Sequence, residues 1–218
     1  MFIVIDGIDG SWKGTQVKLL ETKLRLKNKK VLILDYPRYW NESTFFVEKY
    51  LNWWYWKKVS AKQASLFYAL DRFDELCELE KSFKNYDYII SNRYVSASMI
   101  HQAGKIQDEK EKLDFIKWLD DLEYNTLKIP RPDKTFFLNV TPEMSKKLLE
   151  KKEDREYIKN SKNLDIHEED SEHIKNAWNS AMNIVNMFDD WEKIDCEKDW
   201  ELMSIEEINE IILRRIWV

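Results

Sequence analysis

The sequence is short of the residues that form tight turns, with only 4 glycines and 4 prolines among 218 residues. At the average usage of about 7%, a chain of this length would hold roughly 15 glycines. Tryptophan is abundant instead, with 10 residues. No segment is a glycine- or proline-rich linker, so composition does not divide the chain into separate domains.

Other absences narrow the class of protein. The two cysteines, Cys77 and Cys196, have no metal-like spacing, so we expect both to pack as small apolar groups in a reducing compartment. No apolar run is long enough to span a membrane, and the chain enters a strand at once without a signal-peptide pattern. A net charge of -5 argues against a general nucleic-acid or membrane-surface binder. We therefore expect a cytoplasmic protein that binds neither nucleic acid nor membrane.

The residues that are present indicate one globular α/β domain. Apolar residues make up 44% of the chain and charged residues 34%, and the length suits a single core. Short apolar segments alternate with helical segments, which predicts a five-stranded, mainly parallel sheet flanked by helices. The predicted strands are 2–5, 31–34, 86–91, 135–140 and 191–194. The predicted helices include 17–28, 43–51, 61–83, 109–124, 168–188 and 204–216.

The first predicted strand leads directly into a candidate phosphate-binding loop. Residues 7–15 read GIDGSWKGT, close to the pattern G-x-x-x-x-G-K-[ST]. In such a loop, backbone N–H groups and the positive end of the next helix hold a polyphosphate, and one lysine adds a mobile charge. The candidate phosphate-binding residues are Gly7, Gly10, Ser11, Trp12, Lys13, Gly14 and Thr15.

Trp12 departs from this pattern, because the position before the lysine is usually glycine. A glycine there has no side chain to block the phosphates. A tryptophan in a left-handed conformation costs roughly 1–2 kcal/mol, before the volume of its indole counts. Other tryptophans also stand where turn chemistry favours glycine, namely Trp40, Trp53, Trp54, Trp56 and Trp200.

Two explanations fit these six tryptophans. They could form the hydrophobic patch of an aromatic-rich protein. Alternatively, the source reads the codon UGA as glycine, and the positions were translated as tryptophan. UGG codons at these positions would contradict the second explanation.

Polar segments follow the second and third predicted strands, at the sheet edge where open α/β proteins bind ligands. An arginine at the end of a buried strand is costly unless an anion or carboxylate meets it, so Arg93 is a candidate ligand-binding residue. Asp71 and Arg72 lie in mid-helix, where the pattern predicts a solvated local ion pair. Residues 151–165 lose apolar periodicity and are densely charged, which indicates either a solvated surface loop or a lid over a nucleotide.

Taken together, these segments resemble thymidylate kinases, in the nucleoside-monophosphate kinase branch of the P-loop NTPase fold. The resemblance covers nearly the whole chain and implies a single three-layer kinase domain over residues 1–218, with the lid at about 151–165. The motifs that carry the resemblance are residues 7–10 with Lys13, 36–39, 68–72, 92–95 with Ser98 and Gln102, 132–133 and 165–168.

The resemblance implies transfer of the γ-phosphoryl group of ATP to dTMP, which gives dTDP and ADP. Lys13 and its loop would hold the ATP phosphates, and Arg155 in the lid would bridge donor and acceptor as an arginine finger supplied in cis. Mg²⁺ would bind through phosphates and water, near Asn92, which stands where an aspartate is usual. The resemblance also implies a homodimer.

On the acceptor side, the resemblance gives Asp9 and Arg93 the central roles. Asp9 would bond the deoxyribose hydroxyl and orient an arginine, while Arg93 would bind the dTMP phosphate. Tyr68 would stack on thymine. The remaining residues that it implies for dTMP are Tyr36, Tyr39, Arg72, Ser98 and Gln102.

Two alternatives stay open. The chain could be a nucleotide or nucleoside kinase of the same fold with another acceptor, such as dUMP. It could also be a catalytically impaired protein of this fold that acts by binding a nucleotide or a partner, because Trp12 obstructs the phosphate loop. The aromatic residues 53–56 would then be its candidate interface.

Overall fold

The structure, a computed structural model, describes residues 1–52, 55, 58–156 and 171–216. Its centre is a five-stranded sheet in the order β2-β3-β1-β4-β5, and all four neighbouring pairs are parallel. The strands are β1 (Phe2–Asp6), β2 (Val31–Asp35), β3 (Tyr88–Asn92), β4 (Lys134–Asn139) and β5 (Trp191–Asp195). The five strands and the mainly parallel sheet predicted from the sequence are therefore confirmed.

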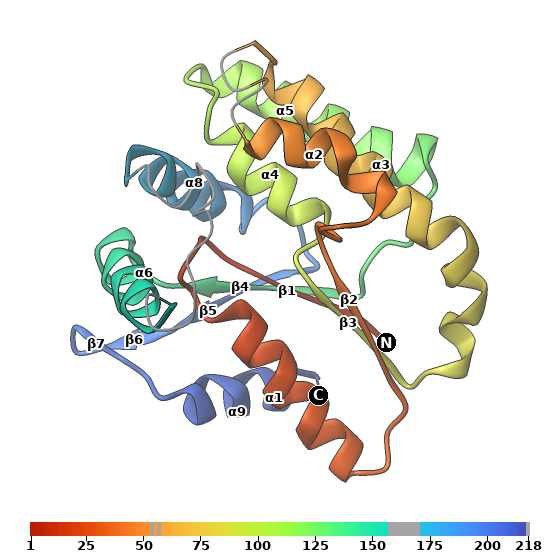
Figure 1. Cartoon of the computed structure of the whole chain (residues 1–218). Coiled ribbons are helices and arrows are strands. Elements are labelled where there is room, and N and C mark those ends of the chain that lie inside the picture. Colours follow the sequence, from red (N-terminus) through yellow and green to blue (C-terminus); the bar gives the residue numbers. More distant parts are fainter. Residues whose placement is uncertain (53–54, 56–57, 157–170, 217–218) are drawn as a thin grey trace.

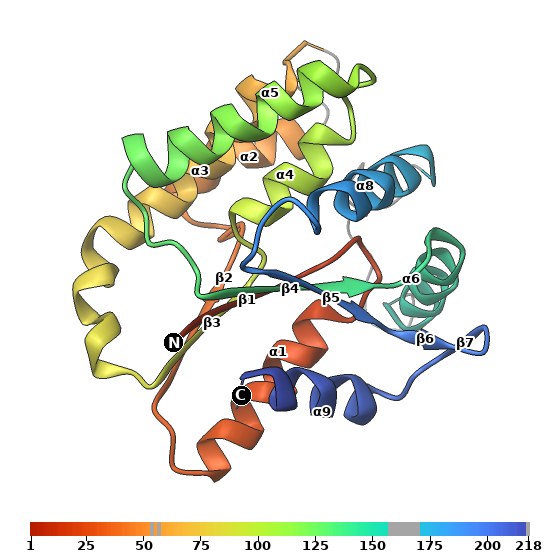
Figure 2. The ribbon, with the colours of Figure 1, turned by 180° about the vertical axis from the view of Figure 1, so that it is seen from behind.

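Helices cover both faces of this sheet, which gives three layers (Figures 1 and 2). One face carries α1 and α9, and the other carries α4 and α8, with α2, α3 and α5 further out. The helices are α1 (Lys13–Leu26), α2 (Phe45–Leu51), α3 (Ala61–Leu79), α4 (Val95–Ala103), α5 (Glu109–Asp120), α6 (Pro142–Glu156), α8 (Ser171–Ile184) and α9 (Ile205–Ile216). Short 3-10 turns at Glu42–Thr44 and Glu80–Asn85, and a π-helical turn at Asp121–Thr126, extend them.

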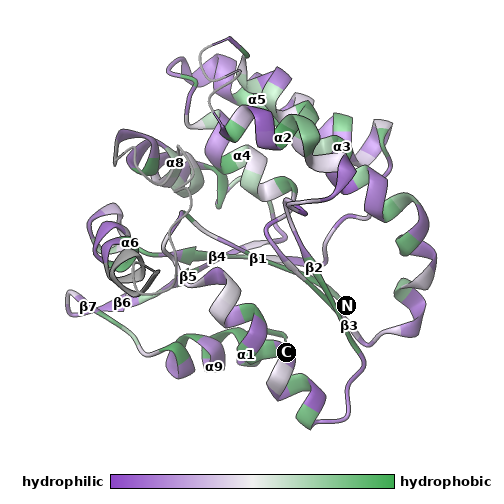
Figure 3. Cartoon of the chain, viewed as in Figure 1, coloured by the Kyte–Doolittle hydropathy of each residue, from purple (hydrophilic) through white to green (hydrophobic). Residues whose placement is uncertain are grey.

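Burial explains why the strands are apolar and the helices amphipathic. All five residues of β1 are buried, as expected for a central parallel strand that is covered on both faces. Figure 3 shows hydrophobic residues along the strands and mixed colours on the helices around them. Leu20 of α1 and Ile212 of α9 pack with Ile3 and Ile5 in one hydrophobic core, while Val4 belongs to a core on the opposite face.

Local sequence signals set the helix starts. Ser60 forms a capping box with Gln63: the Gln63 N–H donates to Ser60 Oγ at 3.3 Å, and the Ser60 N–H donates to Gln63 Oε1 at 2.8 Å. Asp108 caps α5 by accepting from the Glu111 N–H at 2.8 Å. These caps satisfy backbone N–H groups that a helix start leaves without partners.

The structure differs from the sequence predictions at one cysteine, at part of the expected lid and at a small hairpin. Cys196 is buried as expected, but the prediction was wrong for Cys77, which is exposed because α3 buries the neighbouring Leu76 in the core instead. Of the expected lid, residues 151–156 continue α6 and residues 157–165 lie outside the described residues. A small antiparallel hairpin, β6 (Glu197–Lys198) with β7 (Glu201–Leu202), was not predicted. In the described part of the chain, no helix is long and apolar enough to cross a membrane.

Candidate active site

The phosphate loop connects the end of β1 to the start of α1, as the sequence predicts. Lys13 opens α1, is buried, and donates from Nζ to the Ile8 carbonyl oxygen at 2.8 Å. Gly10 has a φ of 74°, and a Cβ on it would lie 2.8 Å from the Ser145 carbonyl oxygen. The loop therefore depends on glycine at position 10, both for its backbone angle and for its close approach to α6.

Trp12 is the N-cap residue of α1 and has a left-handed conformation, with φ 61° and ψ 19°. Its carbonyl oxygen accepts the first helical hydrogen bond, from the Gln16 N–H at 2.9 Å. The indole is half-buried and packs against the core between the sheet and α1. The backbone thus has the conformation expected of the glycine at this position, although a tryptophan occupies it.

A large cavity of about 1100 Å³ opens over the loop. Its lining comes from the phosphate loop, the start of α1, the ends of β2 and β3, α6 and the β6–β7 hairpin. Lys13, Lys18 and Lys147 add positive charge to it, as a site for a polyphosphate requires. The predicted loop residues that line it are Gly10, Ser11, Trp12, Lys13, Gly14 and Thr15.

A second, smaller cavity of about 60 Å³ lies beside the loop, between β2, α3 and α4. It brings together all eight residues that the sequence implied for the acceptor, from four separate segments of the chain. These are Asp9, Tyr36, Tyr39, Tyr68, Arg72, Arg93, Ser98 and Gln102. We call this cavity the acceptor pocket and the larger one the donor cavity.

Asp9 and Arg93 line both cavities. Arg93 donates from Nη2 to Asp9 Oδ1, and its Nη1 lies 3.0 Å from Nε2 of His101. Burial opposes the charge of Arg93, but the carboxylates of Asp9 and Asp6 outweigh it and raise the arginine's pKa. A permanent cation and a carboxylate are thereby held at the boundary between the two cavities.

Arg72 corrects the sequence interpretation of a solvated ion pair with Asp71. The Arg72 side chain is 2% exposed and donates from Nε to Glu123 Oε2 at 2.7 Å, from Nη2 to Glu123 Oε1, and from Nη2 to Ser98 Oγ at 3.2 Å. Burial alone would lower the pKa of Arg72, but the Glu123 carboxylate raises it. The arginine is a buried cation with a fixed orientation at the wall of the acceptor pocket.

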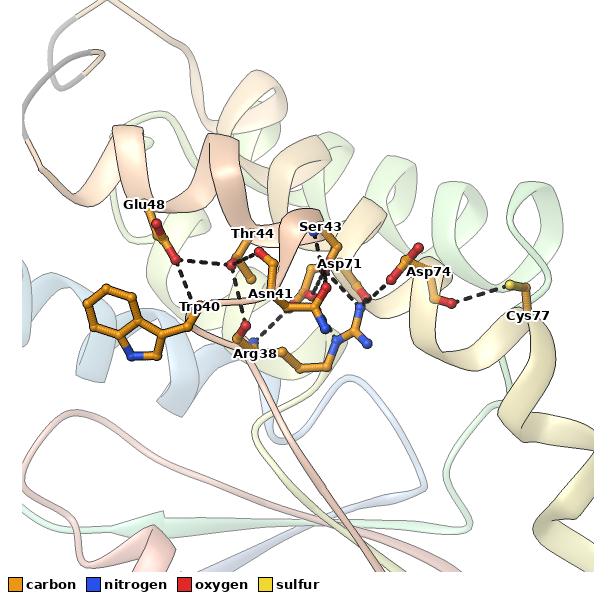
Figure 4. A network of polar contacts seen from close by, with 9 residues as sticks. All are labelled: Arg38, Trp40, Asn41, Ser43, Thr44, Glu48, Asp71, Asp74 and Cys77. Carbon is orange, nitrogen blue, oxygen red and sulfur yellow. Dashed lines mark hydrogen bonds and ion pairs between the residues drawn. The ribbon is translucent and has the colours of Figure 1, made fainter.

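Asp71 has a different partner, Arg38, in a network that Figure 4 shows. Asp71 accepts from the backbone N–H and from Nε of Arg38, both at 3.0 Å, and from Ser43 Oγ at 2.6 Å. Arg38 also donates to Asp74 at 2.7 Å. This network ties the segment after β2, which includes Tyr36 and Tyr39, to α3.

Two acidic residues end β1 and β2, the two strands on either side of β3. Asp6 is fully buried and accepts from the Gly7 N–H at 2.9 Å and from Ser96 Oγ at 2.5 Å; burial raises its pKa. Asp35 lines the donor cavity and accepts from Asn92 Nδ2 at 2.7 Å, and burial raises its pKa as well. The other side-chain atom of Asn92, Oδ1, is buried and makes no hydrogen bond to any described residue.

Oxygen atoms of this kind suit Mg²⁺, which prefers carboxylate, amide and phosphate oxygens and keeps several waters. Within the described ranges, no group of three or more histidines, cysteines and acidic residues forms a complete metal cage. Asn92 Oδ1 and the Asp35 carboxylate therefore fit a cation that is held mainly by phosphates and water.

Sequence reasoning missed three residues of the site. Glu123 lies in a charged helical segment that offers no signal, and His173 reaches Nδ1 of His101 at 3.2 Å only through the packing of α8 on α4. Asp6 had a signal, since it ends a buried strand directly before the loop. Arg155 lies within the bounds of α6, but its side chain is outside the described residues.

Comparisons with known proteins agree with this geometry. A family model described as thymidylate kinase matches residues 5–195. The thymidylate kinase of Mycobacterium tuberculosis is 27% identical over 147 residues, which cover 66% of this chain and 68% of the relative. A probable thymidylate kinase of Pyrobaculum aerophilum is 29% identical, over 66% of this chain and 67% of the relative.

A solved structure of the Candida albicans thymidylate kinase has the same fold. It is similar with a TM-score of 0.73 at 19% identity, and the match covers 99% of this chain and 90% of that one. The loop that opens α1 depends on glycine, and a cation and a carboxylate lie between the two cavities. Because the family model also spans most of the sequence, the chain belongs to the thymidylate kinase family.

Proposed function

We propose that this chain is an ATP-dependent dTMP kinase in which Asp9 and Arg93 act between the two nucleotides. The observation that carries the proposal is that these two residues line both the donor cavity and the acceptor pocket. Phosphoryl transfer requires little covalent chemistry from a protein, which must align two phosphates and stabilise their charge. A group that must contact both phosphates has to stand where the two cavities meet.

On the donor side, the loop amides and Lys13 bind the ATP phosphates at the start of α1. Lys13 Nζ is held by the Ile8 carbonyl oxygen at 2.8 Å and lies 4.0 Å from Asp9, so its charge is directed into the loop. Leu202 of the hairpin lines the same cavity and offers apolar surface for the adenine base. Arg155 is proposed to add a positive charge from the lid.

On the acceptor side, Arg93 binds the phosphate of dTMP and Asp9 accepts from the sugar hydroxyl. Tyr68 stacks on the base, and Tyr36 and Tyr39 close the pocket. Arg72 donates to a base carbonyl, with Ser98 and Gln102 beside it. The Glu123 carboxylate supports this role, because it fixes the guanidinium in the wall of the pocket.

Mg²⁺ fits beside Asn92 and Asp35. The orphan Oδ1 of Asn92 and the Asp35 carboxylate are proposed to bind the ion or its waters when ATP occupies the donor cavity. When bound, the ion neutralises charge on the phosphate oxygens. Asn92 supplies a neutral oxygen, so Asp35 carries the protein's negative charge at this point.

We also propose that the protein is a homodimer that pairs through the outer face of α2 and α3. Large apolar side chains are exposed there, namely Phe45, Phe46, Leu66, Leu70 and Phe73. Phe46 of α2 stacks on Phe67 of α3 at this face, and exposed apolar surface is typical of protein–protein interaction sites. Light scattering after size exclusion tests the proposal, and a monomeric mass at micromolar concentration would contradict it.

The cytoplasmic location stays a prediction of the sequence.

An acceptor panel tests the proposed activity. The enzyme is incubated with ATP and Mg²⁺ and with dTMP, dUMP or thymidine, and the products are separated by ion-exchange chromatography. We expect dTDP from dTMP, with dUMP at least tenfold poorer in kcat/KM because it lacks the thymine methyl group, and no product from thymidine. Preferential phosphorylation of dUMP or thymidine would overturn the assignment of the acceptor.

A further inference from the structure

The six tryptophans in the described part of the chain fall into two groups. Trp118, Trp178 and Trp191 pack against hydrophobic cores. Trp12, Trp40 and Trp200 have positive φ angles of 61°, 72° and 68°, although Trp12 also packs against a core. Positive φ is uncommon for residues other than glycine, asparagine and aspartate, and for bulky residues it is an outlier. The structure describes seven residues other than glycine with a positive φ, and three of them are tryptophan. A random distribution of residue types does not explain this proportion.

Trp200 lies at a position that requires glycine by turn type. Asp199 and Trp200 form the two-residue loop between β6 and β7, whose last and first residues, Lys198 and Glu201, are paired. Both loop residues have positive φ, 52° and 68°. This is the pattern of a type I′ hairpin turn, for which Asp-Gly is among the preferred pairs. The Trp200 side chain is 94% exposed, so no burial compensates for its strained backbone.

Trp40 lies at a second turn position of the same kind. The Asn41 N–H donates to the Arg38 carbonyl oxygen at 3.0 Å, which makes Tyr39 and Trp40 the central residues of a β-turn. Only the second central residue has positive φ, as in a type II turn, where glycine is required at that place. The Trp40 indole is also 94% exposed and points away from the network that anchors this turn (Figure 4).

Trp12, in the phosphate loop, is the third tryptophan at a position where the backbone favours glycine. Its φ of 61° belongs to the residue before the loop lysine, where the pattern has glycine. Three unrelated pieces of backbone, a type I′ turn, a type II turn and a phosphate loop, thus carry the same substitution at the one position where each needs glycine. A common cause explains this better than three separate adaptations.

We infer that residues 12, 40 and 200 are glycine in the protein as its source makes it, because that source reads UGA as glycine. The structure supports the inference independently of any substrate, since it rests on backbone angles. It also separates these positions from Trp118, Trp178 and Trp191, which stay tryptophan. If positions 53, 54 and 56 follow the same rule, glycine rises from 4 to 10 residues and tryptophan falls from 10 to 4.

Glycine in place of these three tryptophans would change the surroundings of both cavities. Trp12 and Trp200 both line the donor cavity, and Trp40 follows Tyr39 of the acceptor pocket. Glycine at these positions frees the approach to the loop and lets both turns adopt their angles without strain.

The gene and the native protein test the inference directly. We expect UGA codons at positions 12, 40 and 200 and UGG codons at positions 118, 178 and 191. In peptides from the source organism, we expect masses that correspond to glycine at positions 12, 40 and 200. UGG codons there, or native peptides that contain tryptophan, would overturn it.

Stability measurements on the recombinant protein give a second test that does not depend on activity. Trp40→Gly and Trp200→Gly are compared with Trp40→Ala and Trp200→Ala, which remove the indole but keep the Cβ that causes the strain. We expect each glycine variant to melt about 2–4 °C above its alanine counterpart. Trp178→Gly, the control, should melt well below the starting protein because it loses a packed side chain and its hydrogen bond to Asn139. Alanine variants as stable as the glycine variants would contradict the inference.

Discussion

The acceptor pocket and the donor cavity differ in how their residues are held. The pocket is small, about 60 Å³, and its charged residues are fixed by ion pairs with Asp9 and Glu123. The donor cavity is about 1100 Å³, and its loop carries a tryptophan where glycine is expected. The charged residues of the pocket are thus held in place before a ligand binds, whereas the donor side carries one bulky side chain in its phosphate loop. Preorganised charge favours catalysis because no reorganisation is needed during the reaction.

The difference shows that a tryptophan at a glycine position can make a phosphate-binding loop hard to recognise. Every residue implied for the acceptor is present and lies in one pocket. The donor loop has its strand, its helix and its lysine in place; Gly14 departs mildly from the pattern, which has serine or threonine there, and Trp12 departs strongly. Variants between the two cavities, beside Arg72 and behind Tyr39 test whether the two regions differ in this way.

The largest effect is expected at the boundary of the two regions. Arg93→Ala should reduce kcat by about 10²–10³, because the cation between the phosphates is lost. Steady-state assays with saturating ATP and dTMP measure this effect. Arg25→Ala is the matched control, since Arg25 forms an exposed pair with Glu21 and should keep full activity. An Arg93→Ala variant within threefold of the parent would show that the boundary residue does not act on the phosphates.

A smaller effect is expected for the residue that positions Arg72. Glu123→Gln removes the buried negative charge but keeps the size of the side chain, so Arg72 loses part of its orientation. We expect KM for dTMP to rise about tenfold, which corresponds to about 1.4 kcal/mol, with kcat changed less than twofold. The kinetics are measured at saturating ATP.

Asp120→Asn is the control for this experiment. Asp120 pairs with Arg131 at the surface nearby, and exposed pairs contribute little to stability. If Glu123→Gln lowers thermal stability but leaves KM for dTMP unchanged, Glu123 serves only the core, and the pocket is less preorganised than we describe.

The smallest effect is expected in the network behind Tyr39. Ser43→Ala removes the 2.6 Å hydrogen bond to Asp71 and should destabilise the fold by about 1 kcal/mol. Differential scanning calorimetry should detect this as a fall in Tm of about 2–4 °C. Thr22→Ala is the control, because its hydroxyl bonds only the preceding turn of its own helix. An unchanged Tm for Ser43→Ala would mean that Arg38 alone fixes this segment.

The sequence predicted the strands well because buried parallel strands are apolar throughout. It did not predict the β6–β7 hairpin, because Asp199-Trp200 hides the Asp-Gly signal that such a turn normally shows. The hairpin was visible only once the backbone angles were known.

The candidate site was predictable where a residue ends a strand, as Arg93 does. The expected pair of Asp71 with Arg72 failed for a geometric reason: neighbouring residues on a helix point in different directions and do not face each other. Their true partners, Arg38 and Glu123, are distant in sequence: the segment after β2 brings Arg38 to α3, and the packing of helices brings Glu123 there.

The most direct test of this account is the rate of ADP release with ATP, Mg²⁺ and dTMP, measured side by side on this sequence, Trp12→Gly and Trp12→Ala. We predict that Trp12→Gly raises kcat/KM at least tenfold, about 1.4 kcal/mol of transition-state stabilisation. Trp12→Ala should fall between the two, because it removes the indole but keeps the strained backbone. Equal rates for all three proteins would contradict the account, since Trp12 would then not obstruct the donor side.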